Sequence, residues 1–195
     1  RAEKMELDIL YEDDDVVVVN KRQGRVVHPA AGNFSGTLVQ GLLYHISELR
    51  ERFPDQELRP GIVHRLDKDT SGVIITAKHQ RSLEYLAGQF ADRRVEKYYL
   101  AEVRGIPSPR SGSIAYPIAR DPRNRKKFTW TRDDGKPSHT LYRTLRRVTP
   151  QSSLVRLQPK TGRTHQLRVH MTALGNPIVG DPLYGKTPSR SEERR

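Results

Sequence analysis

Short β-branched runs alternate with amphipathic stretches along the chain, and this pattern predicts strands interleaved with helices. Val16–Val19 and Val73–Ile75 are apolar and bounded by polar residues, which predicts two strands, the first of them buried. Residues 38–49 place leucine or isoleucine at every third or fourth position. That spacing predicts a helix with an apolar face, and either Ser35 or Thr37 is suited to cap it.

The same pattern continues through the second half of the chain. Residues 83–90 predict a second amphipathic helix, which closes near Asp92. Val95–Val103 and Leu154–Leu157 predict strands. Leu167, Met171 and Leu174 keep helical spacing up to Gly175, which is suited to end a helix. The elements therefore indicate a mixed α and β protein.

Composition limits the kind of protein that these elements can build. A chain of 195 residues favours one domain, so we expect a single catalytic domain over 1–195, with 186–195 as a loop or tail. The absence of cysteine fits a reducing compartment, and we expect a cytoplasmic location. No apolar run is long enough to cross a bilayer. Because the chain begins at Arg1 without a methionine or a leader, we also expect it to be a fragment.

The charge distribution indicates a polyanionic partner. The formal net charge is +12 and the sequence pI is about 10.2. Residues 1–20 carry two bases and seven acids, a net charge of −5, whereas residues 104–147 carry twelve bases and three acids, a net charge of +9. We call 104–147 the basic stripe. Its confinement to one region predicts a surface that follows phosphates.

The densest part of the basic stripe is Arg123–Lys127, which Phe128 and Trp130 follow. Cations contact phosphates and rings stack on bases, so this mixture favours RNA. Asp134-Gly135 predicts a hairpin turn between strands at 128–131 and 140–142, which would place the basic stripe on a β-ribbon. We assign substrate binding to three of its cations: Arg125, Lys126 and Lys127.

The stretch from Gly61 to Lys78, GIVHRLDKDTSGVIITAK, places charged residues at a bend between two apolar segments, Ile62–Val63 and Val73–Ile75, which predicts a strand on each side of a turn. Gly72 permits the positive φ that such a turn needs. If residues 63–67 are extended, Arg65 and Asp67 share one face of the chain. Taken alone, this pattern is typical of a solvated hairpin end.

A magnesium-dependent phosphatase is the sharper alternative, because Asp67 and Asp69 offer two hard oxygen ligands after a strand. Such a site favours a fully apolar strand before the first carboxylate. Here His64 and Arg65 precede Asp67, and no later acidic pair completes an oxygen cage. The phosphatase hypothesis is therefore the weaker one.

As a whole, HRLDKDTSG resembles the signature of the RluA family of RNA pseudouridine synthases. The resemblance implies that Asp67 is the catalytic nucleophile. It implies that Arg65 helps to extrude the target uridine and hold its place in the RNA. Lys97–Ala101 matches a Lys-x-Tyr-x-Ala segment of the same family, which places an active-site role on Tyr99 and leaves Tyr98 as a neighbour.

Residues 161–170, TGRTHQLRVH, resemble the second signature of the family, in which the arginine after Gln-Leu pairs with the catalytic carboxylate. That arginine is Arg168 here, and we assign Arg163 and His165 to substrate binding. Burial alone would raise the pKa of a nucleophilic Asp, and a neighbouring guanidinium favours its ionised form. His165 and His170 are five residues apart and do not share a helix face as zinc ligands would, so no metal is expected.

The resemblance covers residues 7–185 and is greatest to the RluD-like members that modify large-subunit ribosomal RNA. It implies an α+β fold on a largely antiparallel or mixed central sheet, with flanking helices and an RNA-binding cleft. An N-terminal RNA-binding domain and the end of the catalytic domain, both typical of those members, are expected to be missing.

The implied reaction is isomerisation of uridine to pseudouridine on a flipped-out base, without a cofactor. We expect a monomer that acts on ribosomal RNA, with transfer RNA as the other candidate and no membrane partner. A non-catalytic RNA-binding module is the competing hypothesis, since the basic stripe alone would support it equally well.

Overall fold

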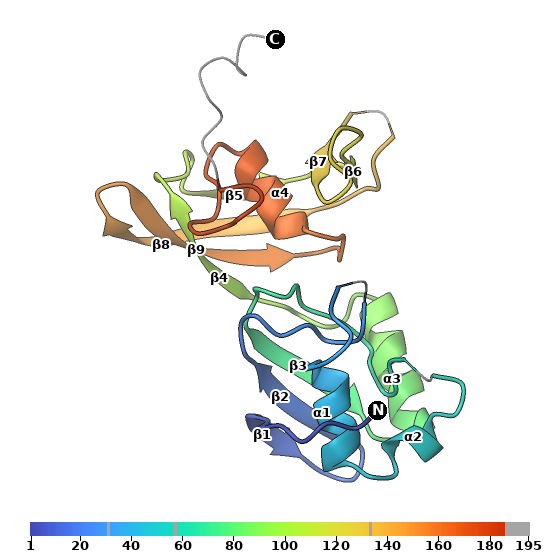
Figure 1. Cartoon of the computed structure of the whole chain (residues 1–195). Coiled ribbons are helices and arrows are strands. Elements are labelled where there is room, and N and C mark those ends of the chain that lie inside the picture. Colours follow the sequence, from blue (N-terminus) through green and yellow to red (C-terminus); the bar gives the residue numbers. More distant parts are fainter. Residues whose placement is uncertain (31, 57, 133, 186–195) are drawn as a thin grey trace. The chain divides into compact units, whose positions relative to one another are not determined.

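The computed structural model describes residues 1–30, 32–56, 58–132 and 134–185, so the predicted tail at 186–195 lies outside the described residues. The chain divides into two compact units, unit 1 at 1–95 and unit 2 at 96–195 (Figure 1). All strand pairings in the described ladders are antiparallel, and helices accompany them in both units. The predicted α+β class with antiparallel sheets is confirmed. The single catalytic domain and the RNA-binding cleft stay predictions.

Unit 1 is built on a three-stranded sheet. Its order is β1 (Ile9–Glu12), β2 (Val16–Lys21) and β3 (Gly72–Ala77), which confirms both predicted strands. Alternate residues point to one face of a strand, and every second residue of β2 is buried. The residues buried on β2 and β3 include Val17, Val19, Lys21, Ile74 and Thr76. Strand alternation therefore carries the lysine at the end of β2 into the interior.

Helices supply a further part of the unit 1 core. α1 (Leu38–His45) begins at the cap Thr37, α2 is Leu49–Arg52, and α3 is Gln80–Ala91. The prediction of one helix over 38–49 is wrong, because the backbone becomes extended at Ile46 and divides the stretch into α1 and α2. The break divides the predicted helix in two but leaves its apolar residues in the core. All four are buried: Leu38, Leu42, Ile46 and Leu49.

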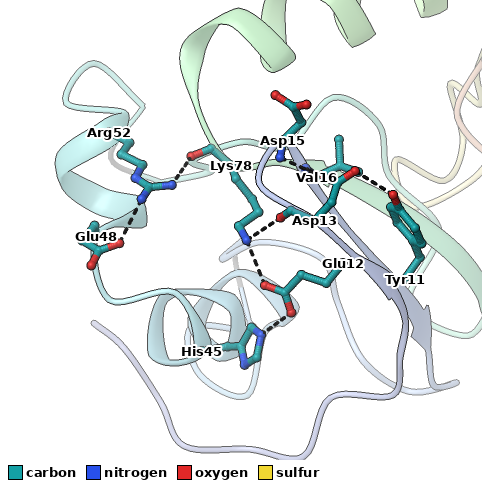
Figure 2. Close-up of polar contacts among 9 residues, drawn as sticks. All are labelled: Tyr11, Glu12, Asp13, Asp15, Val16, His45, Glu48, Arg52 and Lys78. Atoms are coloured by element: carbon teal, nitrogen blue, oxygen red, sulfur yellow. Dashed lines mark hydrogen bonds and ion pairs between the residues drawn. The ribbon is translucent and has the colours of Figure 1, made fainter.

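The acidic run at 12–15 serves the fold of unit 1 (Figure 2). Asp13 accepts hydrogen bonds from the backbone of Asp15 and Val16, which closes the turn between β1 and β2. Lys78 donates to a Glu12 carboxylate oxygen at 3.1 Å and to the Asp13 carbonyl. Hydrogen bonds from His45 and Lys78 outweigh burial and lower the pKa of the Glu12 carboxyl. This run therefore ties the turn to the end of β3.

The central stretch 61–78 has a strand on one side of its turn only. β3 leaves the turn as predicted, whereas the incoming segment makes a single bridge, from Ile62 to Thr76. The prediction of an incoming strand is therefore wrong. Gly61 has φ +72° and lies so close to β3 that a Cβ there would be 2.2 Å from the Ala77 carbonyl oxygen. The close crossing at Gly61 fixes the approach to the turn without a ladder of hydrogen bonds.

Unit 2 contains a four-stranded sheet in the order β4-β9-β8-β5. These strands are β4 (Tyr99–Arg104), β5 (Ser111–Ile114), β8 (Thr140–Thr149) and β9 (Ser152–Pro159). β9 confirms the strand predicted around 154–157, while β4 begins four residues later than the prediction at 95–103.

A separate hairpin joins β6 (Ile118–Arg120) to β7 (Phe128–Trp130). The predicted hairpin between 128–131 and 140–142 is wrong, because β7 pairs with β6 and β8 pairs with β5 and β9. Asp121 accepts from the backbone of Arg123 and Asn124, which stabilises the turn in the β6–β7 loop. The densest basic run is therefore the loop of this ribbon.

The helix α4 (Gln166–Ala173) connects two apolar clusters of unit 2, and it ends before Gly175 as predicted. Met171 joins the core of the four-stranded sheet, and Val169 packs with Ile118 and Tyr184 in a smaller cluster. α4 thus places its first turn between the β6–β7 hairpin and the segment at 181–184. In the described ranges no helix has the length and apolar character needed to span a membrane.

We predict that Gly61→Ala destabilises the protein far more than Gly24→Ala. Both glycines have positive φ, so each alanine costs about 1 kcal/mol of backbone strain. Only at Gly61 does the new methyl group meet backbone, which adds about 2 kcal/mol or more of overpacking. Chemical denaturation checks the difference, and equal losses of stability would contradict the close crossing.

Candidate functional site

In unit 1 the loop that carries Asp67 is anchored by its inward-facing side chains. Leu66 is buried, and His64 stacks on Phe90 at 4.8 Å between ring centroids. The His64 Nε2 atom accepts a hydrogen bond from the Ile75 N–H of β3. Arg65 is exposed and Asp67 is half-buried, and the Asp67 carbonyl accepts from Thr70 within the turn. His64 and Leu66 therefore hold the loop to the protein, while Arg65 between them is exposed.

Lys21 supports this loop from inside the protein. Its side chain is 1% exposed, and its ammonium donates to the carbonyls of Arg22 at 3.1 Å, Arg25 at 2.8 Å and Lys68 at 3.0 Å. Gly24 also donates its N–H to the Lys68 carbonyl. The carbonyl of Lys68, the residue after Asp67, is thus held by two donors.

The charge of Lys21 is electrostatically linked to the acidic loop. Burial lowers the pKa of the Lys21 ammonium to about 8, although Asp69 and, less strongly, Asp67 act to raise it. Sequence reasoning missed Lys21. The available signal was its place in the alternation of β2, two residues after the buried Val19.

His28 is a second polar residue near the loop. Burial is the main cause that lowers the pKa of its imidazole, and the charges of Arg65 and Arg59 act in the same direction. Within the described residues the buried His28 Nδ1 has no hydrogen-bond partner. Burial and these two cations therefore all favour the neutral form of the His28 imidazole.

Tyr99 begins β4 in unit 2 and packs, partly buried, against the core of the four-stranded sheet. Tyr98 is exposed, donates to Glu96, and lies under the Arg156 guanidinium. The two tyrosines therefore occupy different environments, with Tyr99 on the protein side.

Gln166 shapes the second signature loop. The Gln166 amide oxygen accepts from Thr161 and from the Arg163 backbone, and the amide nitrogen donates to the His139 carbonyl. This buried amide ties the loop to the start of β8. His165 then adopts the left-handed conformation, φ 56°, at the start of α4. The Arg163 Nε donates to the Pro137 carbonyl, and the substrate-binding roles of Arg163 and His165 stay predictions.

Arg168 is held by Asp181 through two parallel hydrogen bonds. Arg168 Nε lies 2.7 Å from one carboxylate oxygen of Asp181, and Arg168 Nη2 lies 2.9 Å from the other. The exposed fractions of the two side chains are 18% for Arg168 and 3% for Asp181. Burial acts to raise the pKa of the Asp181 carboxyl, but hydrogen bonds from Arg168, Tyr184 and Leu183 outweigh it and lower that pKa.

An aromatic group lies beside this pair. The Tyr184 hydroxyl is hydrogen-bonded to His165 Nδ1 at 2.9 Å and accepts from the Phe128 N–H at 2.8 Å. The Arg168 guanidinium carbon is 5.0 Å from the centre of the Tyr184 ring, and Lys127 Nζ is 5.9 Å from it. These contacts bring together the start of α4, the β6–β7 hairpin and the segment at 181–184.

The predicted site residues fall into two groups. Asp67 and Arg65 lie in unit 1, and Tyr99, Arg163, His165 and Arg168 lie in unit 2 with the cations of the β6–β7 loop. Arg125 and Lys126 are exposed, and Lys127 approaches the Tyr184 ring. Sequence reasoning missed Asp181 and Tyr184, because GDPLYG at 180–185 carries no chemistry until its contacts are known.

A family model described as RNA pseudouridylate synthase matches residues 15–173, which include Asp67, Tyr99 and Arg168. The chain belongs to this family. Over 95% of its length it is 50% identical to the ribosomal large subunit pseudouridine synthase D of Borreliella burgdorferi. Over 94% of its length it is 48% identical to the protein of the same name in Neisseria meningitidis serogroup A. The chain spans 57% and 47% of the length of these two proteins.

A solved structure shows the same relationship. Human RNA Pseudouridylate Synthase Domain Containing 1 matches 97% of this chain with a TM-score of 0.75 and 33% sequence identity, and the match covers 74% of the human chain. The resemblance that the two signatures indicated is confirmed at the level of the family.

We predict that Lys21 titrates near pH 8 and that Asp69→Asn lowers its midpoint further, because Asp69 is the largest influence that raises the pKa. The unfolded chain titrates its lysines near 10.5, so between about pH 8 and 10.5 the unfolded state holds the extra proton. The contribution of Lys21 to stability therefore increases as the pH rises through that window. Carbon NMR of the lysine side chains measures the midpoint, and a midpoint unmoved by Asp69→Asn would contradict the link.

Proposed function

We propose that this chain carries the catalytic region of an enzyme that isomerises specific uridines to pseudouridine in RNA, with large-subunit ribosomal RNA as the substrate. The observation that carries the proposal is the HRLDKDTSG loop, which Lys21 and His64 hold in a defined turn inside the family match. The names of the two bacterial relatives support the choice of RNA. Acting on ribosomal RNA fits a cytoplasmic location, and we propose that the protein acts as a monomer.

Asp67 is the proposed nucleophile. The reaction breaks the bond from ribose to the ring nitrogen of uracil, rotates the base and forms a bond from ribose to carbon 5, while carbon 5 loses its proton, the freed ring nitrogen gains one and the transient covalent bond to Asp67 breaks. It is redox-neutral and needs no external energy, so it needs no cofactor. Arg65, exposed beside Asp67, is the proposed residue that takes the place of the flipped uridine in the RNA.

Arg168 and Tyr99 complete the proposed chemistry. Arg168 is the proposed residue that keeps the Asp67 carboxylate ionised, a role that the family resemblance assigns, because a neighbouring guanidinium favours the charged form of a carboxyl group. Tyr99 offers a ring that can stack on uracil and a phenol that can exchange a proton.

The proposed RNA interface is the β6–β7 hairpin with the loop before α4. Arg125 and Lys126 point cations into solvent for phosphates. Tyr116 and Trp130 are 43% and 41% exposed, and their ring centroids are 5.2 Å apart. Exposed rings next to cations suit unpaired bases of RNA. Arg163 and His165 are the proposed contacts from the second signature loop.

We predict that Asp67→Asn and Asp67→Ala both abolish pseudouridine formation and leave RNA affinity within about threefold, because no amide or methyl group can form the covalent intermediate. Release of tritium from carbon 5 of labelled uridine in RNA measures turnover. Turnover by Asp67→Ala within about tenfold of the parent would exclude Asp67 as nucleophile.

Asp69→Asn is the matched control, since Asp69 lies in the same loop and is exposed. Asp69→Asn should lower turnover much less than Asp67→Asn does, if Asp69 only shapes the turn and the electrostatic potential at Lys21. Equal losses from Asp67→Asn and Asp69→Asn, together with a requirement for magnesium, would favour the phosphatase-like metal site. In the described ranges no three His, Asp or Glu side chains gather as they would around a metal ion, and the absence of a metal stays a prediction.

We predict that RNA binding weakens steeply with salt, and that replacing Arg125, Lys126 and Lys127 together by Ala flattens the slope of log K against log salt. Three lost phosphate contacts would reduce the slope by about two to three. Replacement of Arg22, Arg50 and Arg81, which are exposed cations of unit 1, is the charge-matched control. If both triple variants change the slope equally, the β6–β7 loop has no special place in the interface.

A further inference from the structure

Asp181 and Tyr184 lie outside both signature motifs, yet they contact proposed functional residues of unit 2. Both carboxylate oxygens of Asp181 accept hydrogen bonds from the Arg168 guanidinium, and the Tyr184 hydroxyl is hydrogen-bonded to His165. Both come from one short turn, 181–184, that follows the last bridged segment of the described chain. One turn therefore contacts two residues of the proposed site.

We propose that the turn Asp181–Tyr184 is a positioning device that fixes Arg168 and His165 for the reaction on RNA. The inference rests on the proposed function and adds two residues to it. Asp181 and Tyr184 act through Arg168 and His165, and they are positioning residues that do not themselves touch the reacting atoms.

The turn is rigid enough for this role. One Asp181 carboxylate oxygen accepts the backbone N–H groups of Leu183 and Tyr184, at 2.8 and 3.0 Å. The Asp181 carbonyl accepts the N–H of Gly185, and a Cβ at Gly185 would lie 2.5 Å from that carbonyl oxygen. The carboxylate therefore closes its own turn while it holds Arg168.

The geometry determines what Arg168 can do. A buried carboxylate with a lowered pKa stays ionised and balances the charge of the guanidinium. Two parallel hydrogen bonds also fix the plane of the guanidinium, which a single contact would leave free to rotate. Asp181 thus fixes the directions in which the Arg168 guanidinium can donate hydrogen bonds.

Tyr184 adds a second restraint. Its ring lies under the guanidinium of Arg168, and its hydroxyl joins His165 to the backbone of Phe128 in β7. The left-handed backbone of His165 is unusual for a residue other than glycine and needs such support. The Tyr184 hydroxyl therefore fixes the position of the His165 imidazole relative to the β6–β7 hairpin, which carries the cations proposed to bind RNA.

The test compares turnover with stability. Asp181→Asn should lower kcat about a hundredfold, as a displacement of about 1 Å does at other sites, and change KM for RNA by less than about threefold. Tyr184→Phe, which keeps the ring, should lower kcat by a smaller factor. Val155→Ala, a cavity in the other core cluster of unit 2, is the matched control for lost stability. An equal loss of kcat from Val155→Ala, at temperatures where all variants are folded, would reduce Asp181 to a structural role.

A double-variant comparison tests whether Asp181 acts through Arg168. Adding Asp181→Asn to Arg168→Ala should lower kcat no further than Arg168→Ala alone. If the losses of kcat from the two single variants multiply in the double variant, the proposal is contradicted, because Asp181 would then act independently of Arg168.

A measurement independent of catalysis separates this inference from the proposed function. The Arg168 Nε–H should give a sharp, slowly exchanging NMR signal in the parent protein and lose it in Asp181→Asn. If the parent makes no pseudouridine and the signal behaves as expected, the proposed function fails while the fixation of Arg168 stands. A signal unchanged by Asp181→Asn would overturn the positioning role itself.

Discussion

A charge removed from water must be surrounded by partners, and each unit of this protein depends on one such charge. In unit 1 the Lys21 ammonium is enclosed by three backbone carbonyls, one of them in the loop that carries Asp67. In unit 2 the Asp181 carboxylate is enclosed by Arg168 and two backbone N–H groups. Because an unpaired buried charge is so unfavourable, each one forces the surrounding backbone into a single arrangement.

Buried and exposed charges therefore have different roles in this chain. Lys21 and Asp181 set geometry, since their partners are few, close and shielded from solvent. The cations of the β6–β7 loop lie at the surface, where individual ion pairs are weak and water screens them. Such charges are suited to attract a polyanion of varied shape. Precise placement and long-range attraction are thus assigned to different residues, a division that suits the proposed reaction on one base within an RNA.

Local elements could be predicted well from the sequence, whereas pairing partners could not. The strands at 16–21 and 72–77 and the helices at 80–91 and 166–173 follow from periodicity. The predicted hairpin at 128–142 failed because Asp134-Gly135 signals a turn without saying which strands it joins, and β6 offered β7 a nearer partner. The incoming strand at 62–63 failed because one close crossing at Gly61 took the place of a ladder.

The sequence by itself determined the family and the identities of the proposed reacting residues, because nine consecutive residues around Asp67 and ten around Arg168 are specific enough to recognise without coordinates. Only the tertiary structure showed what holds those residues in place. Lys21 is 46 positions from Asp67, and Asp181 is 13 positions from Arg168. The alternation of β2 indicates that Lys21 is buried but not which groups surround it, and Asp181 lies in a stretch with no such alternation. The role of each is decided by which backbone groups the fold brings within hydrogen-bond distance.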